Sequence, residues 1–346
     1  MKAKRVLAAR TDGSCPDATV TSPAARPAGI PPRAGWLIVA RKELADHLLS
    51  ARFYILLALL GLVAAATTYS ASDAIRSASE AASQTPSVFL KLFLLGQDPL
   101  PAFYVLVGFI VPVLGIAFGF DAVSGERAEG TLPRLVSQPI YRDDVINGKF
   151  AAGLAVIGLI LVVVTAVVAG IGIVRLGIVP TAEDAVRLGV WLLVSVVYVG
   201  FWLAFATLCS VAFRRAATAL LVAIGLWIVA TLFASLLATL VAGVLAPAPA
   251  DATADQLIAN ATMTDTLSRL APPTLYSDAT RIILDPSART TSSFVLTSQV
   301  YRAVQSTLSI DQSLLLVWIQ VVGIVALTVV SFAVAYVLFM RQEVRS

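Results

Sequence analysis

The side chains best placed for specific chemistry lie in one polar segment, 121–149, between two strongly apolar runs. Nine of its residues are charged, whereas only 13% of the whole chain is charged, and its glycines and two prolines have turn-like spacing. Charges of both signs beside turn residues suit the recognition of a protein surface. Two interpretations stay open from these residues alone: an ordered docking surface, or an ordinary solvated loop anchored by its charges.

The order of residues in this segment favours two short helices joined by a turn. Gly130 tolerates a positive φ, and Thr131 can cap a helix by bonding free backbone N–H groups. A short apolar stripe follows at 132–136, and residues 137–139 end it. Arg142 restarts a helix with two acids near its N-terminus, where the helix dipole favours negative charge.

Motifs for catalysis are missing from the sequence. It has no G-x-x-x-x-G-K-[ST] phosphate loop, no H-E-x-x-H motif and no G-x-S-x-G motif. Its two cysteines, Cys15 and Cys209, lie far apart, and His47 is its single histidine. We therefore predict no enzyme activity, no catalytic residue, no metal site, no nucleic-acid partner and no cofactor bound by this chain itself.

The elements that must position the polar segment are membrane-spanning helices. Hydrophobic residues make up 58% of the chain, and six apolar runs free of Asp, Glu, Lys and Arg are long enough to cross a bilayer. The runs are 53–72, 100–120, 150–174, 188–213, 216–246 and 312–340. Backbone groups in lipid must bond within their own segment, so the predicted fold is an all-α, six-helix transmembrane bundle. The long fifth and sixth runs predict tilt or kinks.

The distribution of Lys and Arg predicts the orientation of the bundle. If both termini are cytoplasmic, 17 of the 25 Lys and Arg residues fall in the inner segments 1–52, 121–149, 214–215 and 341–346. This bias predicts a multi-pass plasma-membrane protein with cytoplasmic N- and C-termini. Residues 1–35 are predicted to form a disordered cytoplasmic tail, and 36–346 the transmembrane domain. Within that domain, 247–311 is an outer helical segment, with short helices at 255–270 and 274–284 broken by two prolines.

Residues 35–52 form the second candidate for a binding element. Their apolar and polar side chains segregate at helical spacing, which predicts an amphipathic helix on the inner membrane surface. The alternative is a simple extension of the first span into the cytosol. The side chains singled out on this interfacial helix are Trp36, Arg41, Lys42, Glu43 and Asp46. His47 is expected to be exposed.

At these residues the chain resembles the permease subunits of the ABC type-2 exporter family. The family pattern is D-x-x-x-x-E-x-x-x-G-T-L-x-x-L-x-S-x-P-[IV]-x-R, followed by G-K at the next helix. The matching residues here are Asp121, Glu126, Gly130, Thr131, Leu132, Leu135, Ser137, Pro139, Ile140, Arg142, Gly148 and Lys149. The interfacial helix, the six spans and the long outer segment before the last span are also similar to the family.

The resemblance implies a partner and a role for the loop. Family members form homodimers or heterodimers of permeases, and each half sits on a separate cytoplasmic ATP-binding subunit, two copies in all. That subunit binds ATP and Mg²⁺ and hydrolyses the ATP. The implied partner-docking residues of the coupling loop are Asp121, Ser124, Glu126, Arg127, Glu129, Gly130, Thr131, Leu132, Leu135, Ser137, Pro139 and Arg142. The interfacial helix would lie beside them and contact membrane lipids.

Three functions follow as alternatives. The first is the membrane subunit of an ATP-driven exporter. The second is a mechanical transmitter that moves no cargo and acts on an extracytoplasmic partner. The long outer segment 247–311 motivates it, and the segment PTLYSDAT at 273–280 resembles the outer segment of a subgroup that includes permeases linked to copper-enzyme maturation and others of unknown cargo. The third is an ATP-independent channel or carrier, which the lack of ionisable residues within the apolar runs disfavours.

Overall fold

The fold is all-helical in the part of the chain that the computed structural model describes, residues 35–77, 87–130, 141–249, 251–288 and 308–341. These ranges contain no strand beyond one isolated bridge between Gln97 and Leu100. Six helical segments are long and apolar enough to cross a membrane, which confirms the predicted all-α membrane fold. The tail at 1–34 and the loop at 131–140 lie outside the described residues, as do 289–307 of the outer segment.

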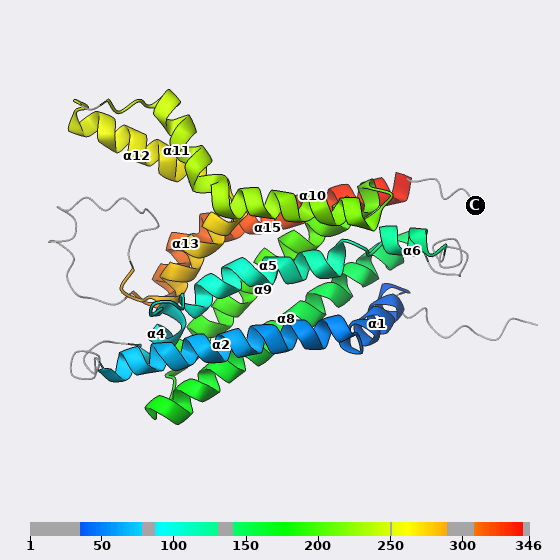
Figure 1. The fold of residues 1–346 in the computed structure, drawn as a ribbon, viewed down its shortest axis with the longest axis horizontal. Helices are drawn as coiled ribbons and strands as arrows, with labels where there is room; N and C mark the ends of the chain where they lie inside the picture. The colour runs from blue at the N-terminus through cyan, green and yellow to red at the C-terminus, as the bar shows by residue number, and fades with distance from the viewer. Residues whose placement is uncertain (1–34, 78–86, 131–140, 250, 289–307, 342–346) are drawn as a thin grey trace, which may run out of the picture. The chain divides into compact units, whose positions relative to one another are not determined.

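The six spans agree with the six predicted runs, and shorter helices lie around them (Figure 1). The spans are α2 (Ala51–Ser77), α5 (Phe103–Gly119) with α6 (Ser124–Ala128), α8 (Arg142–Leu176), α9 (Ala182–Ala212), α10 (Ala216–Ile228) with α11 (Ala234–Leu245), and α15 (Ile310–Arg341). The other helices are α1 (Gly35–Leu48), α4 (Val88–Leu94), α12 (Ala254–Ser268) and α13 (Pro272–Leu284). A π-helical turn, η1 (Val229–Phe233), separates α10 from α11.

Capping residues outside the apolar runs determine where several helices begin or end. Thr181 and Asp184 form a capping box that starts α9 ahead of its apolar run. Gly177, with φ of 67°, ends α8 in the left-handed conformation that glycine favours. The two short helices predicted at 255–270 and 274–284 are α12 and α13. The two prolines at 272–273 open α13, because proline fits the first turn of a helix.

The expected kink in the fifth span is confirmed. The π-helical turn η1 interrupts the span, and α11 turns away from the line of α10 (Figure 1). Helix α12 then packs against α11, and none of its described residues is buried. The α11–α12 pair therefore lies largely outside the core of the bundle.

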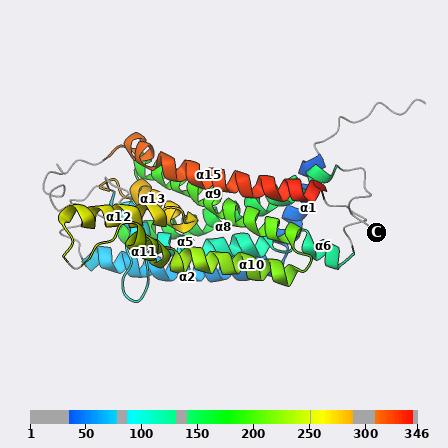
Figure 2. The same ribbon diagram turned by 90° about the horizontal axis from the view of Figure 1, so that it is seen from above.

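Helix α9 is the most buried of the six spans, and it lies alongside α15 (Figure 2). It packs against α5, α8, α10, α13 and α15. Trp191, Tyr198 and Trp202 on this helix are completely buried. Gly119 lets α5 approach closely, since a Cβ there would lie 2.8 Å from the Ala206 Cβ. The bundle is thus organised around one helix that runs from one end of the spans to the other.

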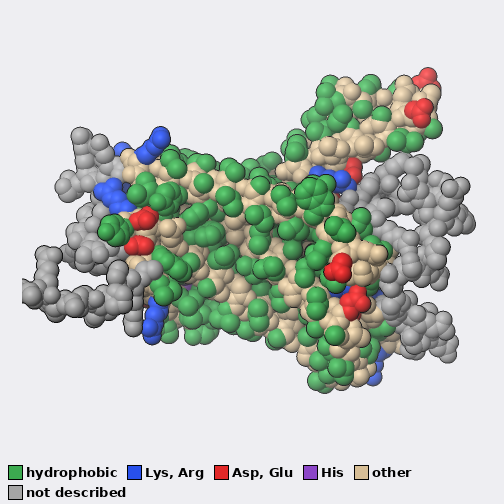
Figure 3. Space-filling view, turned by 180° about the vertical axis from the view of Figure 1, so that it is seen from behind, with side chains coloured by type: hydrophobic (Ala, Val, Ile, Leu, Met, Phe, Trp, Pro, Cys, Tyr) green, Lys and Arg blue, Asp and Glu red, His purple; other side chains and the backbone are tan. Residues whose placement is uncertain are grey.

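Charged side chains gather toward the two ends of the bundle, and the middle is hydrophobic (Figure 3). This is the distribution expected of a protein that crosses a bilayer, because charges at mid-membrane are costly. One end of the bundle carries α1 and α6, and the opposite end carries α4, α12 and α13 (Figure 1).

Candidate partner-docking site

The candidate site is built at the α1 end of the bundle, where α1, α6 and the first turns of α8 meet. Helix α1 packs along α8 and buries Val39 and Ala40. This close packing requires a glycine at position 148. A Cβ on Gly148 would lie 2.7 Å from the Val39 Cβ and 2.8 Å from the Trp36 carbonyl oxygen. Any larger residue would therefore push α1 away from α8.

Lys149 connects the three helices electrostatically. Its Nζ lies 3.2 Å from the Glu43 Oε1 on α1 and 2.7 Å from the Glu126 Oε1 on α6. The three side chains are 10%, 12% and 17% exposed, so water screens these pairs less than it screens pairs on an open surface. We call Lys149, Glu43 and Glu126 the ionic cluster. It makes the position of α1 depend on the position of α6.

Serine side chains attach α6 to the central helix. The backbone N–H groups of Val123 and Ser124 both donate to the Ser210 Oγ on α9, each at 3.0 Å. The Ser124 Oγ lies 3.1 Å from the same oxygen, and Ser124 and Ser210 are fully buried. The start of α6 is therefore fixed to α9, since buried backbone donors need a partner.

An exposed ion pair lies beside this cluster. The Arg52 Nη1 at the start of α2 donates to the Asp121 Oδ2 at the end of α5, at 2.8 Å. The two side chains are 60% and 31% exposed, so the pair adds little stability. It nevertheless sets the direction of both side chains at this edge of the bundle.

The predicted coupling-loop residues divide into an inward and an outward set. Ser124 is buried against Ser210, and Glu126 is part of the ionic cluster, so neither side chain is freely accessible to a partner. Glu129 and Gly130 are exposed, and Gly130 adopts a positive φ of 68°, as predicted. Arg127 and Arg142 are half-buried. Thr131, Leu132, Leu135, Ser137 and Pro139 lie outside the described residues.

The interfacial helix shows the same division. Trp36, Arg41, Lys42 and Asp46 are exposed, whereas Glu43 is turned into the ionic cluster. Lys42 pairs with Asp46 at 3.1 Å on the exposed face. The sequence placed Glu43 and Asp46 in the same group of candidate residues. The packing of α1 on α8 shows that Glu43 faces the bundle, whereas Asp46 faces outward.

His47 differs from expectation. It was predicted to be exposed, but it is partly buried, and its ring meets the ring of Phe118 edge-on at 5.0 Å. This burial lowers the pKa of the imidazole below its usual range. The histidine therefore belongs to the contact between α1 and the end of α5.

Sequence reasoning also missed a polar cluster at the opposite end. Arg187 of α9 is fully buried and donates to the carbonyls of Ile283 (3.0 Å) and Leu308. It also donates to the Ser313 Oγ at 3.2 Å and to the Glu183 Oε1. It was counted only as one of the Arg residues that orient the chain. Its position next to an apolar run was the one signal of a buried role.

The Tyr276 ring of α13 stacks on Tyr198 of α9, with centroids 4.3 Å apart. The Tyr276 hydroxyl lies 2.9 Å from the Ser195 Oγ. Burial raises the pKa of Tyr276 to about 12, so its hydroxyl keeps its proton. Helix α9 thus holds α6 at one end, through Ser210, and α13 at the other.

Among the described residues there is no group of three or more His, Cys, Asp or Glu side chains that could hold a metal ion.

Comparison with known proteins agrees with this architecture. The family model described as "ABC-2 family transporter protein" matches residues 37–344. A probable ABC transporter permease protein NosY from Pseudomonas aeruginosa is 34% identical over 85 residues, 24% of this chain and 30% of the relative. The NosY of Stutzerimonas stutzeri is 31% identical over 134 residues, 37% of this chain and 46% of the relative. The chain therefore matches less than half the length of either relative. The family match extends over all six spans, and the chain belongs to the ABC-2 transporter family as a permease-type membrane subunit.

Proposed function

We propose that this chain is the membrane subunit of an ATP-driven exporter, and that a separate ATP-binding subunit docks on α1 and the 121–149 loop. The observation that carries the proposal is the ionic cluster. Lys149 joins α1 and α6 within one charged and mostly buried cluster at the end of the bundle. A partner that pushes on either helix moves both, because the ion pairs and the tight α1–α8 packing at Gly148 link them.

The central helix supplies a route for this motion across the membrane. Ser210 receives α6 near one end of α9, and Arg187 holds the end of α13 and the start of α15 near the other. Between them, Ser195 and Tyr198 contact Tyr276 of α13 in the middle of α9. Transport needs two states whose populations a ligand shifts. In this proposal ATP binding in the partner selects the state in which α1 and α6 are pressed inward, and α9 carries the displacement to α13.

The charge distribution supports the orientation used here. Nine of the 15 Lys and Arg residues in the described ranges lie at the α1–α6 end, so we take this end as the cytoplasmic one, with both termini on that side. The proposed complex is a dimer of permeases, homomeric or heteromeric, on two ATP-binding subunits. The permease itself hydrolyses no ATP, and Mg²⁺–ATP binds only in the partner subunit.

Purification from the native membrane in mild detergent, followed by mass spectrometry, tests the partner. A stoichiometric soluble protein with a G-x-x-x-x-G-K-[ST] motif supports the proposal. Isolation of this chain alone, in several detergents and with ATP present, overturns it in favour of an ATP-independent channel or carrier.

Two variants test the docking surface in the purified complex. Gly130→Val strains the exposed turn without a clash, since nothing lies within 4 Å of a Cβ at this position. Gly177→Val is a matched control, because Gly177 has nearly the same φ and equally open space at the opposite end of α8. Glu126→Ala breaks the ionic cluster on the α6 side. We expect Gly130→Val and Glu126→Ala to weaken coupling of ATPase activity to transport, while Gly177→Val does not and all three insert normally. Normal transport with unchanged ATPase in both loop variants would remove the docking role.

A second function, the mechanical transmitter, is favoured by the α11–α12 pair. Helix α12 has no buried residue among those described and contacts mainly α11. An extracytoplasmic partner, such as a metalloenzyme under maturation, could engage this surface. Reconstitution of the purified complex in vesicles discriminates the two functions. ATP-dependent movement of cargo without any outer protein excludes the transmitter, whereas ATPase activity that responds only to an outer protein supports it.

A further inference from the structure

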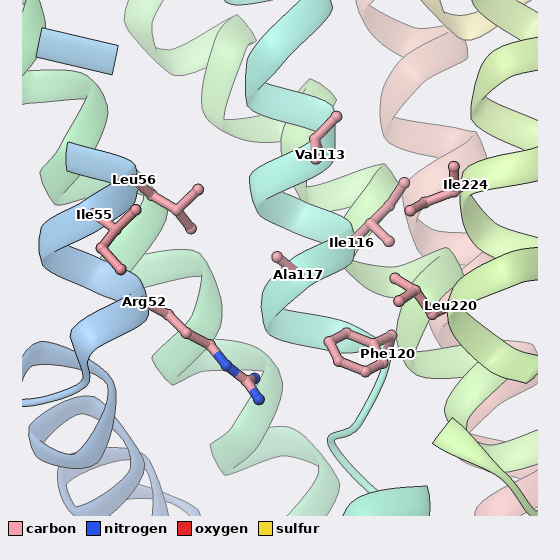
Figure 4. Close-up of a pocket in the computed structure, with 9 residues that line it drawn as sticks. All are labelled: Arg52, Ile55, Leu56, Val113, Ile116, Ala117, Phe120, Leu220 and Ile224. Atoms are coloured by element: carbon pink, nitrogen blue, oxygen red, sulfur yellow. The ribbon is translucent and has the colours of Figure 1, made fainter. Parts of the chain in front are cut away.

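A groove on the outer surface of the bundle carries an inference separate from the docking site. It lies between α2, α5 and α10 near the α1 end, and its cavity volume is about 360 Å³. This volume is within the range of small-molecule sites, about 300–1,000 Å³. Apart from Arg52, its lining is entirely apolar and includes Ile55, Ala117, Phe120 and Ile224 (Figure 4).

Arg52 stands at one end of this groove and is accessible. Its side chain is 60% exposed, and its guanidinium lies 5.8 Å from the centroid of the Phe120 ring. The bond from Nη1 to Asp121 orients the guanidinium. A guanidinium has five N–H donors in a planar fork, so one carboxylate contact leaves donors that can bind a second anion, and phosphate matches their geometry.

The depth of the groove in the membrane follows from the length of α2. A helix of 27 residues is about 40 Å long, which exceeds the hydrocarbon core of about 30 Å. Arg52 is the second residue of α2, so it lies at headgroup level. Ile55 is one turn deeper, and α5 lines the groove from Phe120 inward to Val113, about 10 Å along the helix.

This order, a cation at the interface followed by an apolar slot toward the mid-plane, is complementary to one kind of molecule. We propose that the groove binds one anionic membrane phospholipid, with its phosphate on Arg52 and an acyl chain along α5 between α2 and α10. The lipid holds α2 and α10 against α5 at the end of the bundle where α1 and α6 lie. Binding depends on the groove alone and not on ATP coupling.

Lipid retention by the full-length protein tests the site. The protein is purified in mild detergent, and bound phospholipids are extracted and quantified by mass spectrometry against the bulk membrane. Thermal unfolding is then measured after adding phosphatidylglycerol, phosphatidylcholine or inorganic phosphate. We expect several-fold enrichment of anionic phospholipid at about one per protomer, and a rise in unfolding temperature with phosphatidylglycerol only.

Two variants and two matched controls complete the test. Arg52→Gln removes the cation, and Ala117→Phe fills the apolar slot without touching the cation. Arg214→Gln is the charge control, because Arg214 is exposed at the turn before α10, at the same end of the bundle, and does not line the groove. Ala166→Phe is the size control on an exposed face of α8. Loss of a charge-assisted phosphate contact predicts about ten- to a hundredfold weaker binding in Arg52→Gln. Ala117→Phe should lose binding to a similar extent, and both controls should bind normally.

The other outcomes each overturn the proposal. Loss in Arg52→Gln but not in Ala117→Phe, or stabilisation by inorganic phosphate alone, identifies a surface anion site without an acyl chain. Loss in Ala117→Phe but not in Arg52→Gln identifies a slot for neutral chains. The remaining outcome has two parts: the wild type retains no lipid, and native mass spectrometry shows a changed oligomeric state in Ala117→Phe. Together they would assign the groove to a second copy of this chain.

Discussion

Replacing Lys149 by methionine tests whether the ionic cluster positions α1. At an effective dielectric constant of about 20, each pair of the cluster contributes a gross attraction of about 5–6 kcal/mol. Desolvation offsets most of this, but removing only the cation leaves two carboxylates close together without it. Breaking one partner of a buried pair costs about 3–5 kcal/mol. The slight exposure of these side chains reduces the expected loss to about 2–3 kcal/mol.

Hydrogen exchange of the α1 amides, in the full-length protein in nanodiscs, measures this loss. A cost of 2–3 kcal/mol raises the opening equilibrium of α1 by about 30- to 150-fold. Arg41→Met is the matched control, because Arg41 is an exposed cation on the same helix and lies outside the ionic cluster. The triple variant Lys149→Met, Glu43→Gln, Glu126→Gln should recover most of the protection, since it removes the uncompensated charge as well as the cation.

Three results would refute this reasoning. Unchanged α1 exchange in Lys149→Met would mean that apolar packing on α8 alone holds the helix. Equal loss in Lys149→Met and Arg41→Met would mean that the effect is one of general surface charge. Failure of the triple variant to recover would mean that Lys149 acts through its size and not through its charge.

Three further predictions concern the remaining contacts. Ser210→Ala removes the acceptor of two buried backbone N–H groups. The loss should lower the stability of the fold by about 1–3 kcal/mol per group and increase hydrogen exchange at 123–128. The control Ser235→Ala, on the exposed face of α11, should do neither. Arg187→Met leaves the carbonyls of Ile283 and Leu308 without their donor, so protease cleavage between α13 and α15 should become faster. Arg187→Lys should be cleaved equally fast, because a single ammonium cannot replace the several N–H donors of the planar guanidinium. Burial raises the pKa of Asp278 to about 6, above the unfolded value of about 4. Ionisation therefore favours the unfolded state, and stability should fall by about 3 kcal/mol between pH 4 and pH 6 and then level off. The thermal unfolding temperature should therefore fall between pH 4 and pH 6 in the wild type and not in Asp278→Asn. Parallel pH profiles of the two proteins would contradict this role of Asp278.

Much of this architecture could be predicted because it depends on properties measured along the chain. Hydropathy over about 20 residues located all six spans, since each span must bury its own backbone in lipid. Amphipathic spacing located α1, and glycine chemistry predicted the positive φ of Gly130. The family pattern marked Gly148 and Lys149, although it gave no reason for either residue.

The partners of these residues depended on which helices lie side by side. Ser124 and Ser210 are 86 residues apart in the chain, and no local pattern pairs them. The structure identifies the start of α6 as the element that Ser210 joins to α9. The inward turn of Glu43, the contact of His47 with Phe118 and the burial of Arg187 also follow from helix packing.

Sequence alone therefore determined the class of protein, the number of spans and the segments at their ends. Tertiary structure alone decided that Lys149 links α1 to α6 and that α9 connects both ends of the bundle. The physical reason is the range of the interactions. Helix formation and the transfer of an apolar run into lipid depend on residues that are neighbours in the chain, whereas contacts between different helices, such as the ion pairs, hydrogen bonds and glycine contacts described above, form only after the helices have packed.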